Sequence, residues 1–273
     1  SAAILEVNNV QGGINTSYQY QWWDATGGLP GLPIGGATSN TYQPPTDNVG
    51  VYSYYCVITN DPASTDCEYT TNTHILTVQP APSVVVPNQD QTICEGGIIP
   101  DLYVNPTGPG TITYEWNLVG GSSNPVSTNA TYPVPTNVAG TYEYYCIVSF
   151  SSGGCPDVTS SNITITIVLD PSLTGPVAPS AICDGGVIAN PLDVIVSGGT
   201  GAISYSWDEI GGSSNPVGTD PTYDPGILSP AGIYEYQVTV DYNGNGCDPI
   251  TSNIVQINVV DDPSADDILN DTT

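Results

Sequence analysis

The stretch Gly140-Thr141-Tyr142-Glu143-Tyr144-Tyr145-Cys146-Ile147-Val148 decides the fold of this chain, because it occurs three times. The other copies are residues 50–58 (Gly-Val-Tyr-Ser-Tyr-Tyr-Cys-Val-Ile) and 232–240 (Gly-Ile-Tyr-Glu-Tyr-Gln-Val-Thr-Val). In the third copy Tyr and Val alternate with Glu, Gln and Thr, which predicts a β-strand with one buried face and one wet face. Such a strand needs a second layer against its apolar face, so each copy predicts one β-sandwich around it.

The same sequence blocks surround each copy in the same order. A Tyr-x-Trp strand comes first and predicts one core tryptophan per unit, at Trp22, Trp116 and Trp207. A Gly-Gly turn, a Thr-Tyr strand, a Pro-rich connection, the fold-deciding strand, a Cys-bearing loop and an alternating closing strand follow. No helical 3.6-residue pattern of useful length is present. We therefore predict an all-β chain of three tandem sandwich domains, at 1–80, 81–169 and 170–260, with a tail at 261–273.

Several of these blocks resemble known families across essentially the whole chain. Tyr205-Ser206-Trp207-Asp208, Pro221-Thr222-Tyr223 and Ala231-Gly232-Ile233-Tyr234 look like the polycystic-kidney-disease (PKD) domain, although its Gly-Asp-Gly turn after Trp-Asp is missing. Ile93-Cys94-Glu95-Gly96-Gly97, with Tyr144-Tyr145-Cys146 and Gly154-Cys155, is similar to the immunoglobulin-like repeats of large secreted surface proteins of Bacteroidota, which include gliding and adhesion proteins. The resemblance implies three tandem immunoglobulin-like/PKD-like β-sandwich domains in an extracellular, cell-surface stalk, filament or adhesin. Such motifs specify a fold better than a function.

The charge balance excludes several partners. The chain has 27 Asp and Glu, one His and no Lys or Arg. Nothing could neutralise phosphates, so nucleic acid is excluded as a partner and an anionic membrane surface is disfavoured. No apolar run approaches the roughly 20 residues of a membrane span. Resistance to trypsin-like proteases and an acidic composition tuned for solubility are two alternative explanations for the missing basic residues.

Seven cysteines in small β-domains predict an oxidising, extracellular setting. Cys94 and Cys183 open the second and third units in the same Ile-Cys-[Glu/Asp]-Gly-Gly context. Cys247 is the other cysteine of the third unit, so we predict Cys183–Cys247 and, by alignment, Cys94–Cys155. Closing a loop of about 60 residues would contribute roughly 3–5 kcal/mol in the chain-entropy view.

The remaining cysteines leave alternatives open. Cys56 and Cys67 lie symmetrically about a turn, which favours a cross-hairpin bond in the first unit. The same geometry would permit Cys146–Cys155 with Cys94 left over; otherwise Cys146 is a core thiol at the position of Val238. No Cys-x-x-Cys spacing exists, so a cysteine metal site is not expected.

The first unit lacks the opening Ile-Cys-[Glu/Asp]-Gly-Gly block and the strand before it, because Leu5-Glu6-Val7 aligns with Leu102-Tyr103-Val104. At the other end Asp262-Pro263-Ser264 aligns with Asp170-Pro171-Ser172, so the tail resembles the first strand of a fourth unit. One interpretation is a window cut from a longer array of neighbouring repeats. The other is head-to-tail self-assembly, in which the tail of one subunit supplies the strand missing from the next. The candidate assembly residues are Val259, Val260, Ala265, Ile268 and Leu269.

A calcium site and a glycan site are the two candidate ligand sites, and each also has an ordinary structural explanation. Asp241, Asn243 and Asn245, followed by Gly246, match the start of a calcium loop. Position twelve is however Ser252 instead of Glu, and Asn-Gly is ordinary hairpin chemistry, so a turn is favoured and calcium is the sole candidate cofactor.

Trp23, Tyr55 and Tyr145 are the candidate glycan contacts, because Trp23 should point away from the face that buries Trp22. The predicted function is an extracellular structural protein, a subunit or segment of a filament or adhesin stalk; the alternative is a carbohydrate-binding adhesive module. His74, the sole histidine, has no nucleophile in a recognisable context, so no enzyme is predicted.

Overall fold

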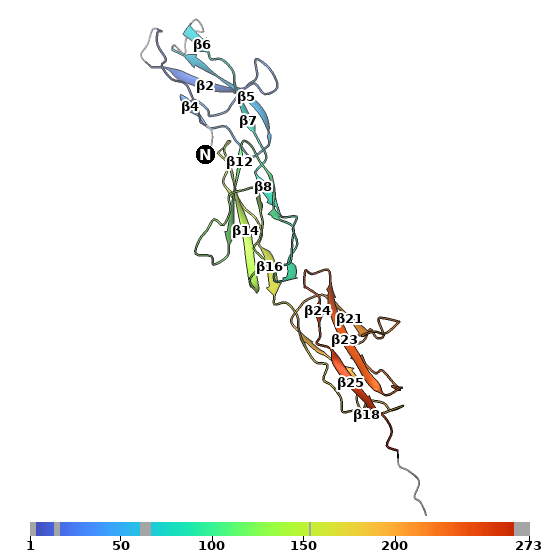
Figure 1. The fold of residues 1–273 in the computed structure, drawn as a ribbon. Helices are drawn as coiled ribbons and strands as arrows, with labels where there is room; N and C mark the ends of the chain where they lie inside the picture. Colours follow the sequence, from blue (N-terminus) through green and yellow to red (C-terminus); the bar gives the residue numbers. More distant parts are fainter. Residues whose placement is uncertain (1–3, 14–16, 61–66, 153, 265–273) are drawn as a thin grey trace, which may run out of the picture. The chain divides into compact units, whose positions relative to one another are not determined.

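The computed structural model describes residues 4–13, 17–60, 67–152 and 154–264, and every named element within them is a β-strand (Figure 1). The predicted all-β class is therefore confirmed. The strands up to Val78 are β1 Leu5–Glu6, β2 Gln19–Asp24, β3 Leu32–Pro33, β4 Thr41–Tyr42, β5 Gly50–Thr59, β6 Glu68–Thr70 and β7 His74–Val78. We refer to them as the first sandwich.

The second and third sandwiches repeat this order with additional strands. The second contains β8 Ser83–Val85, β9 Gln91–Cys94, β10 Leu102–Tyr103, β11 Asn105–Thr107, β12 Ile112–Leu118, β13 Thr131–Tyr132, β14 Gly140–Phe150, β15 Val158–Thr159 and β16 Ile163–Val168. The third contains β17 Ser172–Thr174, β18 Ile182–Cys183, β19 Leu192–Asp193, β20 Ile195–Ser197, β21 Ala202–Glu209, β22 Thr222–Tyr223, β23 Gly232–Asn243, β24 Ile250–Thr251 and β25 Val255–Val260.

Each fold-deciding stretch is the central strand of a five-stranded sheet. The strands β5, β14 and β23 each pair with the Tyr-x-Trp strand on one side and with the closing strand and a short loop strand on the other. The register is the same in the first and third sheets, where Trp22 lies opposite Cys56 and Trp207 opposite Val238. The prediction that these stretches organise the fold is confirmed.

A small two-stranded sheet faces each large one. The Thr-Tyr strand pairs with the Leu-containing strand near the start of its unit, so that Tyr42, Tyr132 and Tyr223 lie opposite Leu5, Leu102 and Leu192. The second and third sandwiches have one further pair each, β8 with β11 and β17 with β20. This further pair is not seen in the described part of the first sandwich.

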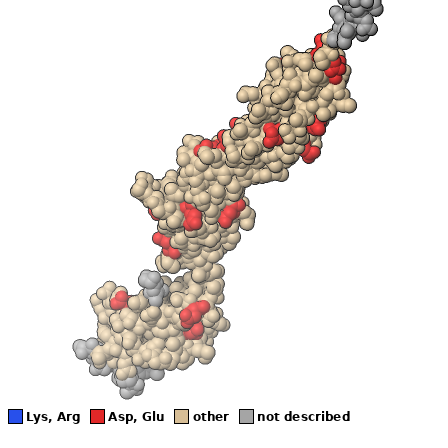
Figure 2. All heavy atoms as spheres, turned by 90° about the horizontal axis from the view of Figure 1, so that it is seen from below, with Lys and Arg blue, Asp and Glu red and all other residues tan. Residues whose placement is uncertain are grey.

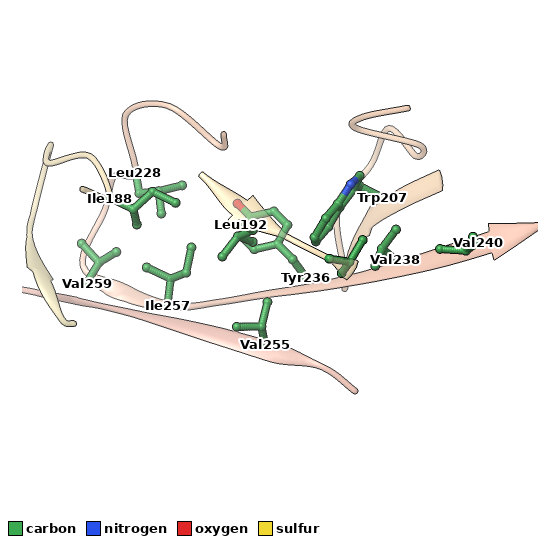
Figure 3. Close-up of a cluster of buried hydrophobic side chains, with 11 residues drawn as sticks. Ile188, Leu192, Trp207, Leu228, Tyr236, Val238, Val240, Val255, Ile257 and Val259 are labelled. Atoms are coloured by element: carbon green, nitrogen blue, oxygen red, sulfur yellow. The ribbon is translucent and has the colours of Figure 1, made fainter. Parts of the chain in front are cut away.

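A repeated aromatic triad fills the core between the layers. In the third sandwich the ring centroids of Trp207 and Tyr223 lie 5.8 Å apart, and those of Tyr223 and Tyr236 lie 5.4 Å apart. Trp207 is fully buried, and eleven buried residues form this core (Figure 3). Aromatic pairs at such distances are favourable beyond their area burial. One tryptophan per core was predicted, and Trp22, Trp116 and Trp207 are all buried.

The chain divides into two compact units. One consists of the chain up to Val85 with Asn105–Glu115 and Cys146–Ser160; the other consists of Val86–Val104, Trp116–Tyr145 and the chain from Ser161 onward. Among the described residues, no helix is long and apolar enough to cross a membrane.

Candidate functional site

The closing strand β7 of the first sandwich has an unpaired outer edge within the described chain. In the second sandwich the equivalent strand β16 pairs with β14 on one side and, in parallel, with β9 on the other. In the third, β25 pairs with β23 and with β18 in the same way. Strand β7 pairs with β5 alone, so its outer amide and carbonyl groups are available to another strand.

Exposure of the core-facing side chains shows the effect of this missing partner. Leu76 lies opposite Tyr52, as Ile165 lies opposite Tyr142 and Ile257 opposite Tyr234. Ile165 and Ile257 are 0% exposed, whereas Leu76 is only half-buried. The apolar face of β7 is therefore incompletely covered in the first sandwich.

A second unpaired edge lies at residues 8–10. By the alignment of Leu5 with Leu192, these residues are equivalent to β20, which pairs with β17 in the third sandwich. They form no strand, and Asn9 has a φ of 56°, a left-handed conformation that Asn tolerates better than most residues. The segment is thus not extended in the absence of a partner strand.

An open groove of about 870 Å³ is lined by both edges. Its lining includes Asn8–Val10 from one edge and His74 from β7, with the core residues Leu5, Trp22, Tyr54 and Ile58 beneath. The equivalents of this floor in the other sandwiches, such as Leu102 and Trp116, are covered by their own chain and are 0% exposed. The groove therefore lies over the core of the first sandwich, whose floor residues are slightly more exposed, at 2–8%.

The floor of the groove is apolar, whereas its rim is polar and includes the carboxylate of Glu6. Burial, with Asp24 adding to it, raises the pKa of the Tyr42 and Tyr54 phenols, so both rings stay neutral. The indole Nε1–H of Trp22 donates to the carbonyl of Ser39 at 2.9 Å, which fixes the ring. Figure 2 shows acidic side chains scattered over the surface and no basic ones. An occupant would be held by apolar contact and backbone pairing instead of salt bridges.

The core of the first sandwich is small. Among the residues that the structure describes, its buried cluster has six members, against eleven in the third sandwich. The partly buried side chains packed against it include Val7 and Val10, which line the groove, and Leu76 of β7. A strand seated in the groove would bury further apolar area, at about 25 cal/mol for each Å² removed from water.

The observed disulfide joins Cys94, at the end of β9, to Cys247, in the loop after β23. Their Cα atoms are 4.9 Å apart and 153 residues separate them in sequence. Both residues belong to the second compact unit. A structural disulfide is typical of proteins in oxidising, non-cytoplasmic settings.

The predicted pairs Cys183–Cys247 and Cys94–Cys155 are wrong. Cys183 lies opposite Val260, beside the Gly232 end of β23, whereas Cys247 follows the Asn243 end. The 12 residues of β23 span about 36 Å, and bonded cysteines need Cα atoms within about 7 Å. Because the opening and closing strands pair in parallel, the two cysteines of one unit lie at opposite ends of its central strand.

The predicted Cys56–Cys67 bond is also not formed, and Cys56 has a free thiol. In the hairpin, the residue opposite Cys56 is Thr71, whose amide donates to the Cys56 carbonyl at 2.9 Å. Cys67 lies opposite Asn60 instead. The Cys56 side chain points into the core with 0% exposure, so it faces away from any bond across the hairpin.

We expect alkylation of the native protein at pH 8 by iodoacetamide to modify Cys183 and to spare Cys56 and Cys146. Cys183 is exposed, whereas burial raises the pKa of the Cys56 thiol and raises that of Cys146 to about 11. The thiolate is the reactive form, and little of it exists for Cys146 at pH 8. Mass spectrometry of chymotryptic peptides measures the modification, with guanidinium-unfolded protein as the control. Equal modification of Cys146 and Cys183 in the folded state would contradict this placement.

The aromatic residues singled out for glycans do not form an open platform. The rings of Trp23 and Tyr55 are stacked with centroids 5.9 Å apart. Tyr55 is 5% exposed and its hydroxyl donates to the Pro30 carbonyl; Trp23 and Tyr145 are half-buried. The expectation that Trp23 is exposed is therefore wrong, because the β3 segment and Tyr55 cover it.

Two of the three residues that match a calcium loop lie in a strand. Asp241 and Asn243 belong to β23, paired with Ser204 and Ala202, and the Asn245 carbonyl accepts from the Cys94 amide at 3.0 Å. Ser252, at position twelve, is buried and its hydroxyl accepts from the Val238 amide at 3.1 Å. In the described part of the chain, no three or more His, Cys, Asp or Glu side chains cluster as metal ligands would.

Two of the five candidate assembly residues belong to β25, and the other three follow it in the sequence. Val259 and Val260 pair with Ile182 and Cys183 inside their own sheet, so they are not available to another subunit, contrary to expectation. Ala265, Ile268 and Leu269 lie outside the described residues. Any donated strand therefore begins after Val260.

The sequence predicted the missing opening block but not the groove residues Asn8–Val10, nor the bond between Cys94 and Cys247. The signal for the groove was present, because the alignment leaves both β7 and residues 8–10 without partner strands. The disulfide could not be predicted in the same way, because no sequence pattern shows which unit supplies the partner of a given cysteine.

Comparisons with known proteins support the fold alone. No family model and no curated protein matches the chain. Among solved structures, the three N-terminal domains of the highly immunogenic outer capsid protein (Hoc) of bacteriophage RB49 match with a TM-score of 0.51 and 12% identity, over 93% of this chain and 92% of that one. This match supports the tandem immunoglobulin-like class of the chain.

Two other solved structures are less similar. Extracellular domains 3–5 of Drosophila OTK match with a TM-score of 0.39 and 15% identity, over 91% of this chain and 87% of that one. Immunoglobulin domains 1–5 of Sidekick-1 match with a TM-score of 0.40 and 15% identity, over 95% of this chain and 57% of that one. The tandem immunoglobulin-like β-sandwich class of the chain is supported by its own strands and by the capsid-protein match.

Proposed function

We propose that this protein is an extracellular structural subunit that assembles head-to-tail at the cell surface, each copy inserting its C-terminal segment as a β-strand into the groove of another copy's first sandwich. The observation that carries the proposal is the unpaired edge at residues 8–10, whose equivalents β11 and β20 are paired with β8 and β17 in the other two sandwiches. Strand addition to an exposed sheet edge is a common mode of recognition, with backbone hydrogen bonds giving affinity.

The repeat register identifies the donated residues. Asp262-Pro263-Ser264 aligns with Asp170-Pro171-Ser172, and Ser172 begins β17. In the third sandwich β17 pairs antiparallel with β20 so that Leu173 lies opposite Val196. Transferred to two copies, this register puts Ser264–Asp266 against Asn8–Val10, with Ala265 opposite Asn9. Asn9 would then move from its left-handed conformation to an extended one.

The chemistry of the tail suits this groove. The tail contains the apolar residues Ile268 and Leu269 after the pairing residues. In this proposal the groove of one copy takes a strand that follows the third sandwich of another copy. A head-to-tail contact of this kind produces a filament.

Deletion of residues 265–273 is expected to abolish filaments of the full chain, because it removes the donor strand and leaves the groove unchanged. Electron microscopy and light scattering at physiological salt measure assembly; salt is needed because copies with a formal net charge of −27 repel each other. His74→Glu, which places a carboxylate in the lining of the groove, is expected to block assembly as well. Its control is Ile233→Glu, at a side chain that is 64% exposed in the third sandwich.

Filaments that persist after the deletion would contradict the proposal and would favour a strand from elsewhere in a longer chain as the natural occupant. Filaments lost equally in Ile233→Glu would show that added charge, and not the groove, controls assembly.

A further inference from the structure

We propose that the turn at residues 183–186 of the third sandwich is a docking site for the cysteine-bearing hairpin loop of a further sandwich of this repeat, and that Cys183 forms a disulfide with that loop. This inference goes beyond the proposed function and does not depend on it. The observation that carries it lies within the chain. The equivalent turn of the second sandwich, residues 94–97, holds such a loop through the disulfide between Cys94 and Cys247.

The two turns begin in the same way. Cys94 and Cys183 each end an edge strand that pairs in parallel with the closing strand of its sheet, opposite Val168 and Val260 respectively. In both turns the amide of the residue after the cysteine donates at 2.9 Å to the carbonyl of that valine. The strand end that carries the thiol is therefore held identically in the two sandwiches.

The glycines after the two cysteines match as well. Gly96 and Gly185 both have a φ of 76°, in the left-handed region that favours glycine. The amides of Gly97 and Gly186 return to the cysteine carbonyls at 3.1 and 2.9 Å. Cys183 is therefore presented by the same backbone that presents Cys94.

The loop that covers Cys94 shows what such a turn recognises. Besides the disulfide, the Cys94 amide donates to the Asn245 carbonyl at 3.0 Å. A Cβ on Gly246 would come within 2.7 Å of the Gly97 Cα, so a side chain at this loop position would collide with the Gly-Gly turn. The recognised features are thus a cysteine, the glycine directly before it and the backbone carbonyl before that glycine.

The same groups are uncovered in the third sandwich. Cys94 and Ile93 are 0% and 4% exposed, whereas Cys183 is exposed with a free thiol and Ile182 is only half-buried. Successive amides of a strand point to opposite sides. The Asp184 amide is directed to β25, so the Cys183 amide is directed to the outer edge of β18, which has no partner strand in the described part of the chain.

The occupant must come from another sandwich. Cys247 lies at the opposite end of β23 from Cys183 and is already bonded to Cys94. We therefore assign the site to the hairpin loop of a sandwich joined after the third as the third is joined after the second. That loop needs glycine directly before its cysteine, for the reason that applies to Gly246.

Bond formation needs a two-electron oxidant, and a small-molecule disulfide such as oxidised glutathione supplies it. The thiolate of Cys183 attacks one sulfur of this disulfide, forms a mixed disulfide and releases one small-molecule thiolate. The thiolate of the docked loop then attacks the Cys183 sulfur and displaces the second one. Two protein thiols are oxidised to one disulfide, one small-molecule disulfide is reduced to two thiols, and the departing thiolates take up the protons that the protein thiols lose.

The test supplies the occupant by extending the full chain. A second copy of residues 172–273 is joined after Pro263, which repeats the Asp-Pro-Ser connection found between the second and third sandwiches. The added copy carries Cys183→Ser, so that the extended chain has a single Cys183. After incubation with oxidised glutathione at pH 8, we expect a Cys183–Cys247 peptide pair beside the Cys94–Cys247 pair, with loss of iodoacetamide labelling at Cys183. Mass spectrometry of chymotryptic peptides measures both.

Two glycines of the added loop provide matched variants. Gly244 and Gly246 have φ values of 89° and 68°, and a Cβ on Gly244 would meet nothing within 4 Å. Gly246→Asn in the added copy should abolish the Cys183–Cys247 pair and restore labelling of Cys183. Gly244→Asn in the added copy should retain the pair, because this side chain points away from the turn's contacts.

The outcomes that would overturn the inference are distinct from those of strand donation. Cys183 that stays labelled in the extended chain, or equal behaviour of the two glycine variants, would contradict docking at this turn. Covalent dimers of the unextended chain through Cys183, formed as readily as the bond in the extended chain, would show an exposed thiol without a specific partner. Strand donation is tested separately, because it predicts filaments of the unextended chain without any oxidant.

Discussion

Replacing Cys94 with Ser is expected to lower the free energy of unfolding of the second compact unit by about 3–5 kcal/mol, as expected for loss of a disulfide that closes a long loop. The loop is long because 153 residues separate Cys94 from Cys247. Cys94 is also fully buried, so the substitution leaves a polar hydroxyl among the residues that cover it. Denaturant unfolding under non-reducing conditions measures the change.

A double-mutant cycle makes this expectation sharper. Cys247→Ser should cost about as much as Cys94→Ser, and the double variant should cost little more than either, because both remove the same bond. Cys183→Ser is the matched control, since an exposed thiol without a bond is expected to matter by less than about 0.5 kcal/mol in the unassembled chain. A large effect of Cys183→Ser that is shared with Cys247→Ser would instead support the intradomain pair predicted from the sequence.

Trp207→Ala is expected to destabilise the third sandwich by about 3–5 kcal/mol, the usual cost of removing a fully buried large aromatic side chain. Trp207 is 0% exposed, and its indole Nε1–H donates to the Asp220 carbonyl at 2.9 Å. Its loss removes the ring contact to Tyr223 and leaves the Asp220 carbonyl without this donor. Hydrogen exchange of peptides from each sandwich measures the change separately for each core.

The change in stability of Trp207→Ala is interpreted by comparison with two further variants. Ile227→Ala, at a side chain that is 73% exposed, should change stability by less than about 0.5 kcal/mol. Trp22→Ala should cost less than Trp207→Ala in the unassembled chain, because Trp22 lies in the floor of a groove that is already open. Equal costs for Trp22 and Trp207 would indicate that the groove is filled by the chain's own residues.

Predictions from the sequence were most accurate where a pattern is local. Alternation along 232–240 predicted a strand, and β23 contains the whole stretch with Tyr236, Val238 and Val240 buried. Alignment of the three units identified the tryptophans and the Thr-Tyr strands of the core. These features follow from the two-residue period of a strand, which is visible in one dimension.

Predictions failed where two segments far apart in the sequence had to be matched. The pairing Cys183–Cys247 was predicted from counting cysteines within one unit, but the parallel pairing of β18 with β25 puts Cys183 at the opposite end of β23 from Cys247. The exposure expected for Trp23 failed for a similar reason, because alternation along β2 does not reveal that Tyr55 stacks on the outer face.

The sequence by itself determined the all-β class, the three repeated units and the core tryptophan of each. The tertiary structure alone decided which cysteines meet, which strand edges stay unpaired and where a groove lies over the core of the first sandwich. The physical reason is that a strand's facing residues depend on its own side chains, whereas its neighbours depend on strand direction and register. Both are set by hydrogen bonds and packing between segments that can lie more than a hundred residues apart.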